Sequence, residues 1–270
     1  MSARADGTST DAGRPLVPSA PPGPLPAVAL RQVSKVYGGG RHAVAALDGI
    51  DLDVAPGEMV CVVGASGCGK STLLNLVADL DRPTAGRLDV QGRTALMFQD
   101  AALFPWLTVA GNVDLALKLR GIPRSERKAR VESLLRIVHL DGFGAKQPHE
   151  LSGGMRQRVA LARAIAQDAD VLLMDEPFGA LDAMTRDLLL DELESLWADR
   201  NLTVLFVTHN VREAARLADR IVVLSSRPGR VTATIEVDIE RPRRIESPEV
   251  SELAGTVIDQ LRREVRRHAS

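Results

Sequence analysis

The stretch that decides the fold is "GASGCGKST", residues Gly64–Thr72. The apolar run "EMVCVVG" (58–64) precedes it, and "KSTLLNLVADL" (70–80), with apolar residues at helical spacing, follows it. A strand, a glycine-rich turn of the pattern G-x-x-x-x-G-K-[ST] and a helix, in this order, are typical of a phosphate-binding loop. The stretch therefore predicts an α/β fold built around a nucleotide phosphate site.

The residue types of this loop suit phosphate chemistry. Gly64, Gly67 and Gly69 permit a tight loop whose N–H groups wrap phosphate oxygens. We expect Lys70 to neutralise charge on the β- and γ-phosphates and Ser71 to place a hydroxyl on Mg²⁺. The alternative, a chance glycine-rich turn, is disfavoured by the flanking strand and helix. The predicted nucleotide-binding residues are Gly64, Ala65, Ser66, Gly67, Cys68, Gly69, Lys70, Ser71 and Thr72.

A second glycine-rich stretch, "LSGGMRQR" (151–158), stands before a segment with good helix propensity. Ser152 suits a helix N-cap, and Gly153 and Gly154 leave backbone N–H groups bare at the positive end of the helix dipole. Such an end binds anions. The stretch contains neither a lysine nor a metal ligand, so it predicts only half of a phosphate site.

Two acids end the apolar run "VLLMDEP" (171–177). We expect Asp175 to hold Mg²⁺, directly or through water, and Glu176 to polarise or deprotonate the attacking water. The alternative is an exposed strand end that carries two solvated acids.

Three more residues are candidates because of their positions. His209 ends "LTVLFVTH" (202–209), and Gln99 follows "ALMF" (95–98). Parallel strands bring their C-terminal ends to one crevice, which favours a catalytic His209 over a structural one and makes Gln99 a neutral ligand for Mg²⁺ or water. Tyr37, the only tyrosine, is predicted in the loop "SKVYGGG", where its ring stacks on adenine or, alternatively, packs within the fold.

The composition of the chain limits the class of protein to which it can belong. The chain has 270 residues, 45% of them hydrophobic, a net charge of −1 and two cysteines, which fits a globular protein of a reducing compartment with no nucleic-acid partner. No apolar run reaches the roughly 18 residues that span a bilayer.

Alternating strand and helix patterns predict a largely parallel, helix-covered sheet. The Pro- and Gly-rich residues 1–26 are expected to be a disordered tail. Near the C-terminus, apolar residues recur at helical spacing and predict a helix packed on the domain: Val250, Leu253, Val257, Leu261 and Val265.

From about Val28 to Arg230 the chain resembles the ATP-binding subunit of ABC transporters, because the family's motifs appear in order: "GASGCGKST", Gln99, "LSGGMRQR", "VLLMDEP", "GALD" and "VTH". The resemblance implies a P-loop NTPase of the ABC ATPase type, with a mixed, largely parallel core sheet, a small antiparallel β subdomain and an inserted helical subdomain. We expect an ATPase domain over residues 27–230, the helical subdomain at about 101–167, and a C-terminal strand and helix over 231–270.

The resemblance also implies a homodimer in which "LSGG" of one chain closes over the γ-phosphate held by the other. It assigns adenine stacking to Tyr37, metal binding and coupling between domains to Gln99, the catalytic carboxylate to Glu176, the γ-phosphate sensor to His209 and communication between the sites to Asp182. ATP and Mg²⁺ are the implied ligands.

Three stretches are similar to importers of the nitrate, sulfonate and taurine type: "MFQDAALFPWLTVAGNV", "PFGALDAMTR" and "VVLSSRPGR". We therefore expect integral membrane permease subunits as partners, a solute-binding protein as an indirect partner, and a peripheral location on the cytoplasmic face of the cell membrane. Phe104 and Trp106 form either a patch that receives the permease or part of the subdomain packing. The alternatives are a soluble ABC-type ATPase that acts on nucleic acid or ribosomes, and a partner of an exporter permease.

Overall fold

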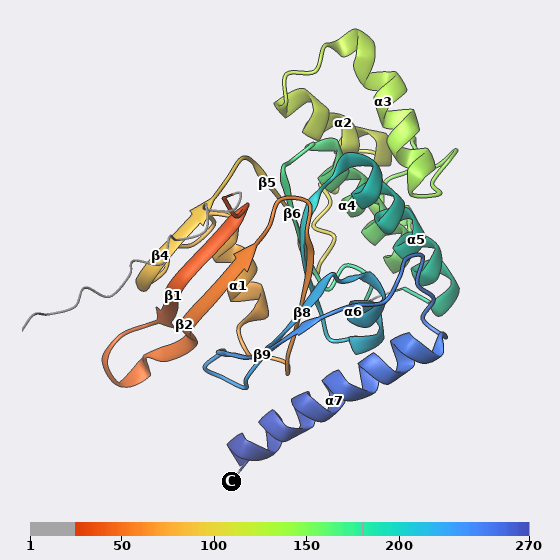
Figure 1. Cartoon of the computed structure of the whole chain (residues 1–270). Coiled ribbons are helices and arrows are strands. Elements are labelled where there is room, and N and C mark those ends of the chain that lie inside the picture. The colour runs from red at the N-terminus through yellow and green to blue at the C-terminus, as the bar shows by residue number, and fades with distance from the viewer. Residues whose placement is uncertain (1–24, 180, 270) are drawn as a thin grey trace, which may run out of the picture.

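The computed structural model describes residues 25–179 and 181–269, and in these two ranges the chain forms two sheets and a set of covering helices (Figure 1). The expected tail, residues 1–26, lies outside the described residues except for 25 and 26.

The central sheet has six strands in the order β5-β6-β7-β3-β8-β9. Neighbours from β5 to β8 pair in parallel, and β9 pairs with β8 antiparallel. The middle strands are buried along their whole length, which is why their sequences are continuous apolar runs. The predicted mixed, largely parallel core sheet is confirmed. Its strands are β3 (Met59–Val63), β5 (Thr94–Met97), β6 (Val171–Asp175), β7 (Thr203–Thr208), β8 (Arg220–Leu224) and β9 (Val231–Glu236).

A second, antiparallel sheet lies at one side of the molecule, with the strand order β2-β1-β4 (Figure 1). Its strands are β1 (Val28–Tyr37), β2 (Val44–Val54) and β4 (Ala85–Val90). The pairing of β1 with β2 continues through exposed residues up to Tyr37, which lies opposite Val44. The prediction that Tyr37 lies in a loop is therefore wrong, since it is the last residue of β1.

Helix α1 follows the glycine-rich loop but is shorter than its pattern predicts. It ends at Val77 because Asp79 adopts a left-handed conformation (φ +55°) and closes the C-terminus. Leu80, expected on the buried face of this helix, lies beyond it and is 61% exposed.

Three helices lie between β5 and β6 in the chain, and two of them, α2 and α3, project at one end of the molecule (Figure 1). The residues before α2, expected to be helical from Ala101, form a loop with a single turn at 105–107 and end at the N-cap Thr108. The helices are α1 (Lys70–Val77), α2 (Val109–Leu119), α3 (Arg124–Ile137), α4 (Gly153–Ala166), α5 (Ala183–Arg200), α6 (Val211–Leu217) and α7 (Pro248–Ala269), with 3₁₀ turns at Gly40–His42 and Pro148–Glu150.

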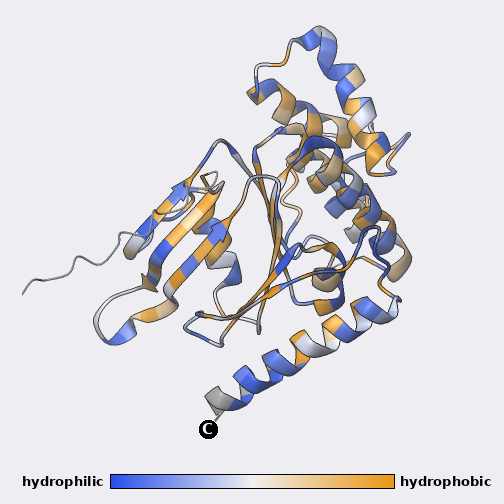
Figure 2. Cartoon of the chain, in the orientation of Figure 1, coloured by the Kyte–Doolittle hydropathy of each residue, from blue (hydrophilic) through white to orange (hydrophobic). Residues whose placement is uncertain are grey.

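The central sheet separates two apolar cores because successive residues of a strand point to opposite faces. On β3, Met59, Cys61 and Val63 pack with apolar residues of α4 to α7, whereas Val60 and Val62 pack with α1 and the antiparallel sheet. Figure 2 shows the central strands as the most continuously hydrophobic part of the chain. The sheet is therefore covered on both faces. The C-terminal ends of its parallel strands are left as the place where a ligand can bind.

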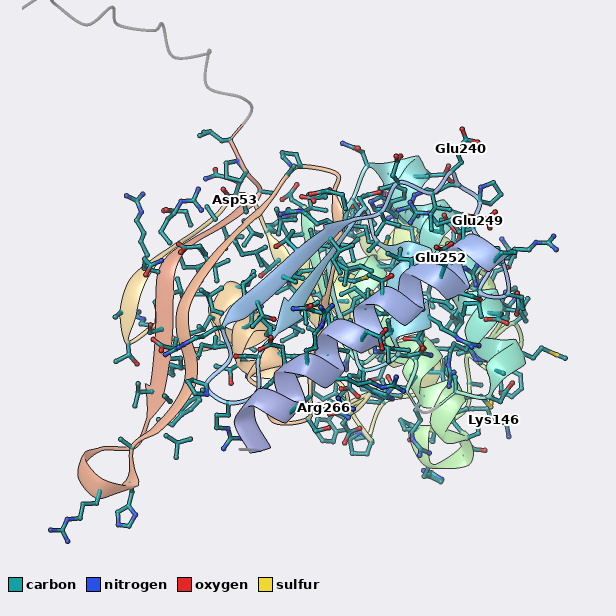
Figure 3. All side chains as sticks on the ribbon, turned by 60° about the horizontal axis from the view of Figure 1, so that its bottom comes forward. Asp53, Lys146, Glu240, Glu249, Glu252 and Arg266 are labelled. Carbon is teal, nitrogen blue, oxygen red and sulfur yellow. The ribbon has the colours of Figure 1, made fainter. Side chains whose placement is uncertain are left out.

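Helix α7 packs against α6, as the spacing of its apolar residues predicts; the side chain of Val265, also predicted on this face, lies outside the described residues. Val250 and Val257 are fully buried, and Leu253 and Leu261 pack partly buried against the same core. Figure 3 shows α7 running across the face of the molecule from Glu249 to Arg266. Among residues 25–179 and 181–269, no helix is both long and apolar enough to cross a membrane.

Candidate functional site

The loop from Gly64 to Gly69 joins buried strand β3 to α1 and holds a lysine inward. Lys70 is 6% exposed, and its Nζ donates to the backbone oxygens of Gly64 (2.9 Å) and Ala65 (3.2 Å). At Gly69, φ is +103°, and a Cβ would lie 2.6 Å from the carbonyl oxygen of Ala46, so only glycine fits this position. The ammonium group thus lies inside the curve of the loop, where it can meet a phosphate.

Asp175, the last residue of β6, brings a carboxylate to the start of α1. It is 9% exposed, and this burial, with the neighbouring Glu176 charge, raises its pKa, although the Ser71 hydroxyl and Lys70 act in the opposite direction. Carboxylate and hydroxyl oxygens are the ligands that Mg²⁺ prefers. Asp175 and Ser71 therefore form a set of hard oxygen donors beside the phosphate loop.

Glu176 lies at the centre of a polar cluster formed by the ends of three strands. Its Oε2 is 2.8 Å from Nδ1 of His209, which follows β7, and accepts from Nε2 of Gln99 (3.4 Å), two residues after β5. Glu176 has φ +46°, a left-handed conformation rare for a residue with a side chain, and its N–H donates to the carbonyl of Val207 (2.9 Å). From this strained backbone position the Glu176 carboxylate faces His209. Strained backbone conformations of this kind are common at functional sites.

The turn that carries His209 is held by hydrogen bonds on its buried side. The Thr208 hydroxyl donates to Glu213 (2.8 Å) and accepts from the N–H of Asn210 (2.9 Å). Glu213 is 3% exposed, and burial raises its pKa above the usual value despite the Thr208 and Arg186 contacts. The His209 ring, 61% exposed, is thus mounted on a fixed turn.

A pocket of about 560 Å³ unites most of the predicted site residues. The expected residues that line it are Tyr37, Ser66, Gly67, Gly69, Lys70, Ser71, Thr72, Gln99, Glu176 and His209. Three others, Val44, Ala46 and Arg227, were not singled out from the sequence. Ala46 lies on the small sheet and Arg227 in the loop between β8 and β9, so no local pattern joins them to the glycine-rich motif.

Tyr37 lies at the edge of this pocket and is 41% exposed. Its hydroxyl donates to Asp81 (3.0 Å), and the Lys35 ammonium lies 4.9 Å from the ring centre. These contacts orient the ring and leave much of it open to a planar ligand.

Ser152 of "LSGG" and Asp182 of "GALD" lie outside this pocket. Ser152 caps α4 through a bond from the N–H of Met155 (3.2 Å), as predicted, and Asp182 caps α5 through a bond from the N–H of Thr185 (3.0 Å). Neither residue lines the pocket of its own chain. The N-terminal end of α4, which the sequence predicts to bind an anion, is thus exposed and does not share a pocket with the phosphate loop.

Comparisons with known proteins show the family of this chain. The family model described as ABC transporter matches residues 47–179. The taurine import ATP-binding protein TauB of Burkholderia pseudomallei is 44% identical over 250 residues, which cover 87% of this chain and 96% of that protein. The chain belongs to the ABC transporter ATP-binding family. An uncharacterised ABC transporter ATP-binding protein of Methanocaldococcus jannaschii is 43% identical over 244 residues, which cover 87% of this chain and 91% of that protein.

Solved structures of this family match the whole cassette. A dimeric ATP-binding cassette in a post-hydrolysis state bound to ADP and Pi superposes with a TM-score of 0.73 and 32% identity, covering 79% of this chain and 100% of that one. A dimeric bacterial ABC transporter cassette gives a TM-score of 0.74 at the same identity and coverage. This ABC cassette therefore binds ATP and hydrolyses it, as the family does.

Proposed function

We propose that this ABC cassette is the ATP-hydrolysing subunit of an importer and that two copies close around two ATP molecules. The related structures are dimeric cassettes, and related cassettes are named for the import of taurine or the transport of bicarbonate. The bicarbonate relative, CmpC of Synechococcus elongatus, is 46% identical, and the match covers 34% of its length. These names favour a small anion as cargo, such as a sulfonate, taurine, nitrate or bicarbonate.

The observation that carries the proposal is the contact of Glu176 with both His209 and Gln99 in one pocket with Lys70. In our mechanism Glu176 accepts a proton from the water that attacks the γ-phosphate, and His209 holds the terminal phosphate and the carboxylate in register. Lys70 and the loop N–H groups stabilise the charge that develops on the phosphate oxygens. Tyr37 offers its exposed ring to the adenine.

The residues around Asp175 fit Mg²⁺. A buried carboxylate close to the Ser71 hydroxyl, with the Gln99 amide at the same pocket, is an oxygen-donor set with places left for phosphate and water. In the described part of the chain, no group of three or more His, Cys, Asp or Glu residues is placed to hold a metal ion by itself. The phosphate and water oxygens would have to complete the coordination. Asp175, Ser71 and Gln99 would hold the ion, which would supply positive charge next to the transferred phosphate.

The surface beside α2 suits a membrane permease. A groove of about 960 Å³ there is lined by Phe98, Phe104 and Leu119, of which Phe98 is 42% and Leu119 80% exposed. Trp106 is 72% exposed, and its ring lies 5.4 Å from that of Phe104. Such clustered apolar side chains mark interaction sites. We assign this surface to a cytoplasmic segment of the permease, which gives the cassette a peripheral place on the cytoplasmic face of the cell membrane.

The buried Asn112 side chain fixes the segment that presents Trp106. It accepts from the N–H of Phe104 (2.8 Å) and donates to the carbonyls of Phe104 (3.2 Å), Leu107 (3.3 Å) and Thr108 (3.0 Å). The aromatic pair is therefore part of a preorganised surface, which lowers the entropic cost of binding a partner.

The Glu176→Gln variant tests the proposal. Without the carboxylate we expect ATP hydrolysis to fall by about 10² to 10⁴ while ATP binding persists, because general-base catalysis is lost but the phosphate loop is not. ATP should then hold the variant as a dimer in size-exclusion chromatography. Glu252→Gln, on the outer side of α7, is the control and should keep full turnover (Figure 3). Normal turnover in Glu176→Gln would remove Glu176 from the mechanism.

The same trapped variant identifies the partner. Tagged Glu176→Gln protein with ATP, mixed with detergent-solubilised membranes of the source cell, should retain a polytopic membrane protein that mass spectrometry identifies. The solute-binding protein that functions with that permease can then be screened against sulfonates, taurine, nitrate and bicarbonate. Recovery of ribosomal or nucleic-acid-associated chains in place of a permease would overturn the transport assignment and leave the ATPase chemistry intact.

A further inference from the structure

The loop between β8 and β9 is hydrogen-bonded to β2 and packs against the phosphate loop. The N–H of Gly229 donates to the carbonyl of Ala46 (2.9 Å), and the N–H of Asp48 donates to the carbonyl of Gly229 (3.0 Å). A Cβ at Gly229 would lie 2.2 Å from the carbonyl oxygen of Cys68, so the two loops touch through their backbones. Inside the turn, the Ser225 hydroxyl donates to the carbonyl of Pro228 (2.8 Å). These bonds fix the position from which Arg227 extends.

Arg227 reaches from this loop over the phosphate loop into the nucleotide pocket. Its Nε donates to the carbonyl of Gly67 (3.1 Å), and its Nη2 lies 3.2 Å from where a Cβ of Gly67 would be. The side chain is exposed and lines the same pocket as Lys70 and Ser71. The guanidinium is thus held at the phosphate-binding end of the pocket by a single hydrogen bond.

Arg227 differs from the neighbouring arginines in how its charge is paired. In the two described ranges, no carboxylate forms an ion pair with it, whereas its neighbours in the same hairpin are paired, Arg230 with Asp48 and Arg220 with Glu58. A nucleoside triphosphate brings several negative charges to a pocket that already contains Glu176. A planar guanidinium with free N–H donors matches phosphate oxygens in geometry as well as in charge.

We propose that Arg227 is a second phosphate-binding cation of the nucleotide site and binds the phosphate groups of a nucleoside di- or triphosphate together with Lys70. The inference rests on the proposed position of ATP in this pocket. Because Arg227 contacts Gly67 of the phosphate loop, it recognises the phosphate chain and is indifferent to the base.

Nucleotide titrations of the full-length chain test this role. We compare Arg227→Gln with Arg230→Gln, which removes an arginine of the same hairpin that is paired with Asp48 and does not line the pocket. Binding of fluorescent mant-ATP, mant-ADP and mant-GTP is measured at low salt and again at 0.5 M NaCl. Circular dichroism and thermal unfolding show whether both variants fold as wild type does.

We expect Arg227→Gln to raise Kd about five- to tenfold for all three nucleotides, because a charge-assisted phosphate contact is lost. The difference should shrink at high salt, since an exposed cation is screened. Arg227→Lys should recover part of the affinity because it keeps the charge but not the fork of donors. Arg230→Gln should bind as wild type does, and KM for ATP should rise in Arg227→Gln more than kcat falls.

Two results would overturn the inference. One is an unchanged Kd in a folded Arg227→Gln protein. The other is a higher Kd for Arg230→Gln equal to that for Arg227→Gln, which would mean that the effect does not come from a contact made by Arg227 in the pocket. Failure of the proposed function has a different signature, in which wild type and Arg230→Gln also fail to bind mant-ATP, and that result would reject both proposals.

Discussion

At the scale of single residues, the site is built at a cost to stability. Asp175 is 9% exposed, and burial together with Glu176 raises its pKa above the usual value. A carboxyl whose pKa is higher in the folded than in the unfolded chain binds more protons when folded, so the free energy of unfolding falls as pH rises. The fall begins near the unfolded pKa of about 3.9 and continues through the raised value.

The fall of the free energy of unfolding with rising pH predicts how the Asp175→Asn variant behaves. Without nucleotide or metal, the variant should melt at a higher temperature than wild type at pH 8, and the gap should narrow toward pH 4, because the amide carries no charge to desolvate. Its ATPase activity should fall by about 10² or more, since the proposed metal ligand is gone. Thermal unfolding in EDTA across this pH range and a phosphate-release assay measure both effects.

Asp81 gives the matched contrast. Its pKa is lowered, chiefly by the hydrogen bond from Lys35. Its contribution to the free energy of unfolding is therefore present above the unfolded pKa and is lost as pH falls through the lower pKa of the folded chain. Asp81→Asn should therefore lower the melting temperature at pH 8. An Asp175→Asn protein that melts below wild type at both ends of the range would contradict our account of the buried carboxylate.

At the scale of elements, α7 is held by a narrow apolar stripe. Val250, Ala254 and Val257 are at most 2% exposed and pack against the core beside α6, which begins two residues after His209. We expect Val257→Ala to lower the free energy of unfolding by about 2 kcal/mol through lost burial and a residual cavity. Urea unfolding followed by circular dichroism measures the change.

Gly255 lies on the exposed side of the same helix, and a Cβ there meets nothing within 4 Å. Gly255→Ala should raise the free energy of unfolding by about 0.5–1 kcal/mol, because alanine loses less backbone entropy in a helix. If Val257→Ala had no effect while Gly255→Ala stabilised the protein, α7 would be helical in solution but not packed on the domain.

The elements also show what a sequence pattern reveals and what it leaves out. Strands β3, β6 and β7 were predicted because burial on both faces requires unbroken apolar runs. The end of β1 was missed because its last residues are exposed and are strand only by pairing with β2.

The same limit applies to the pocket. Lys70, Glu176 and His209 were predicted because each ends or follows a strand or a glycine-rich turn, where residue type and position together indicate chemistry. Arg227 has no such local pattern. It reaches the pocket only because Gly229 brings the β8–β9 loop against the phosphate loop, a tertiary contact between segments about 160 residues apart.

At the scale of the whole molecule, the two glycine-rich stretches that the sequence predicts to bind phosphate do not share a pocket within one chain. The phosphate loop and Glu176 line one pocket, whereas Ser152, at the open end of α4, does not line it. A two-fold dimer brings each half of one chain against the other half of its partner. Our proposed function thus makes the ATP site a product of assembly, and this can be tested by distributing two defects between chains.

Lys70→Ala disables the phosphate loop, and Ser152→Arg blocks the end of α4 with a bulky side chain. Each variant alone should be inactive. In an equal mixture, half of the dimers pair one chain of each kind and contain one site with both halves intact, so we expect about a quarter of wild-type ATPase when sites act independently. If hydrolysis requires both sites, retention of radiolabelled ATP by the mixture still reports the intact composite site.

The double variant Lys70→Ala/Ser152→Arg, mixed with wild type, separates assembly in trans from assembly in cis. If the site forms in trans, every mixed dimer has two broken sites, so an equal mixture should keep only the wild-type dimers and about a quarter of the activity. If the site forms within one chain, each wild-type chain stays active and about half remains. Activity near one half, with mixed dimers verified by a tag pull-down, would mean that "LSGG" serves the phosphate of its own chain.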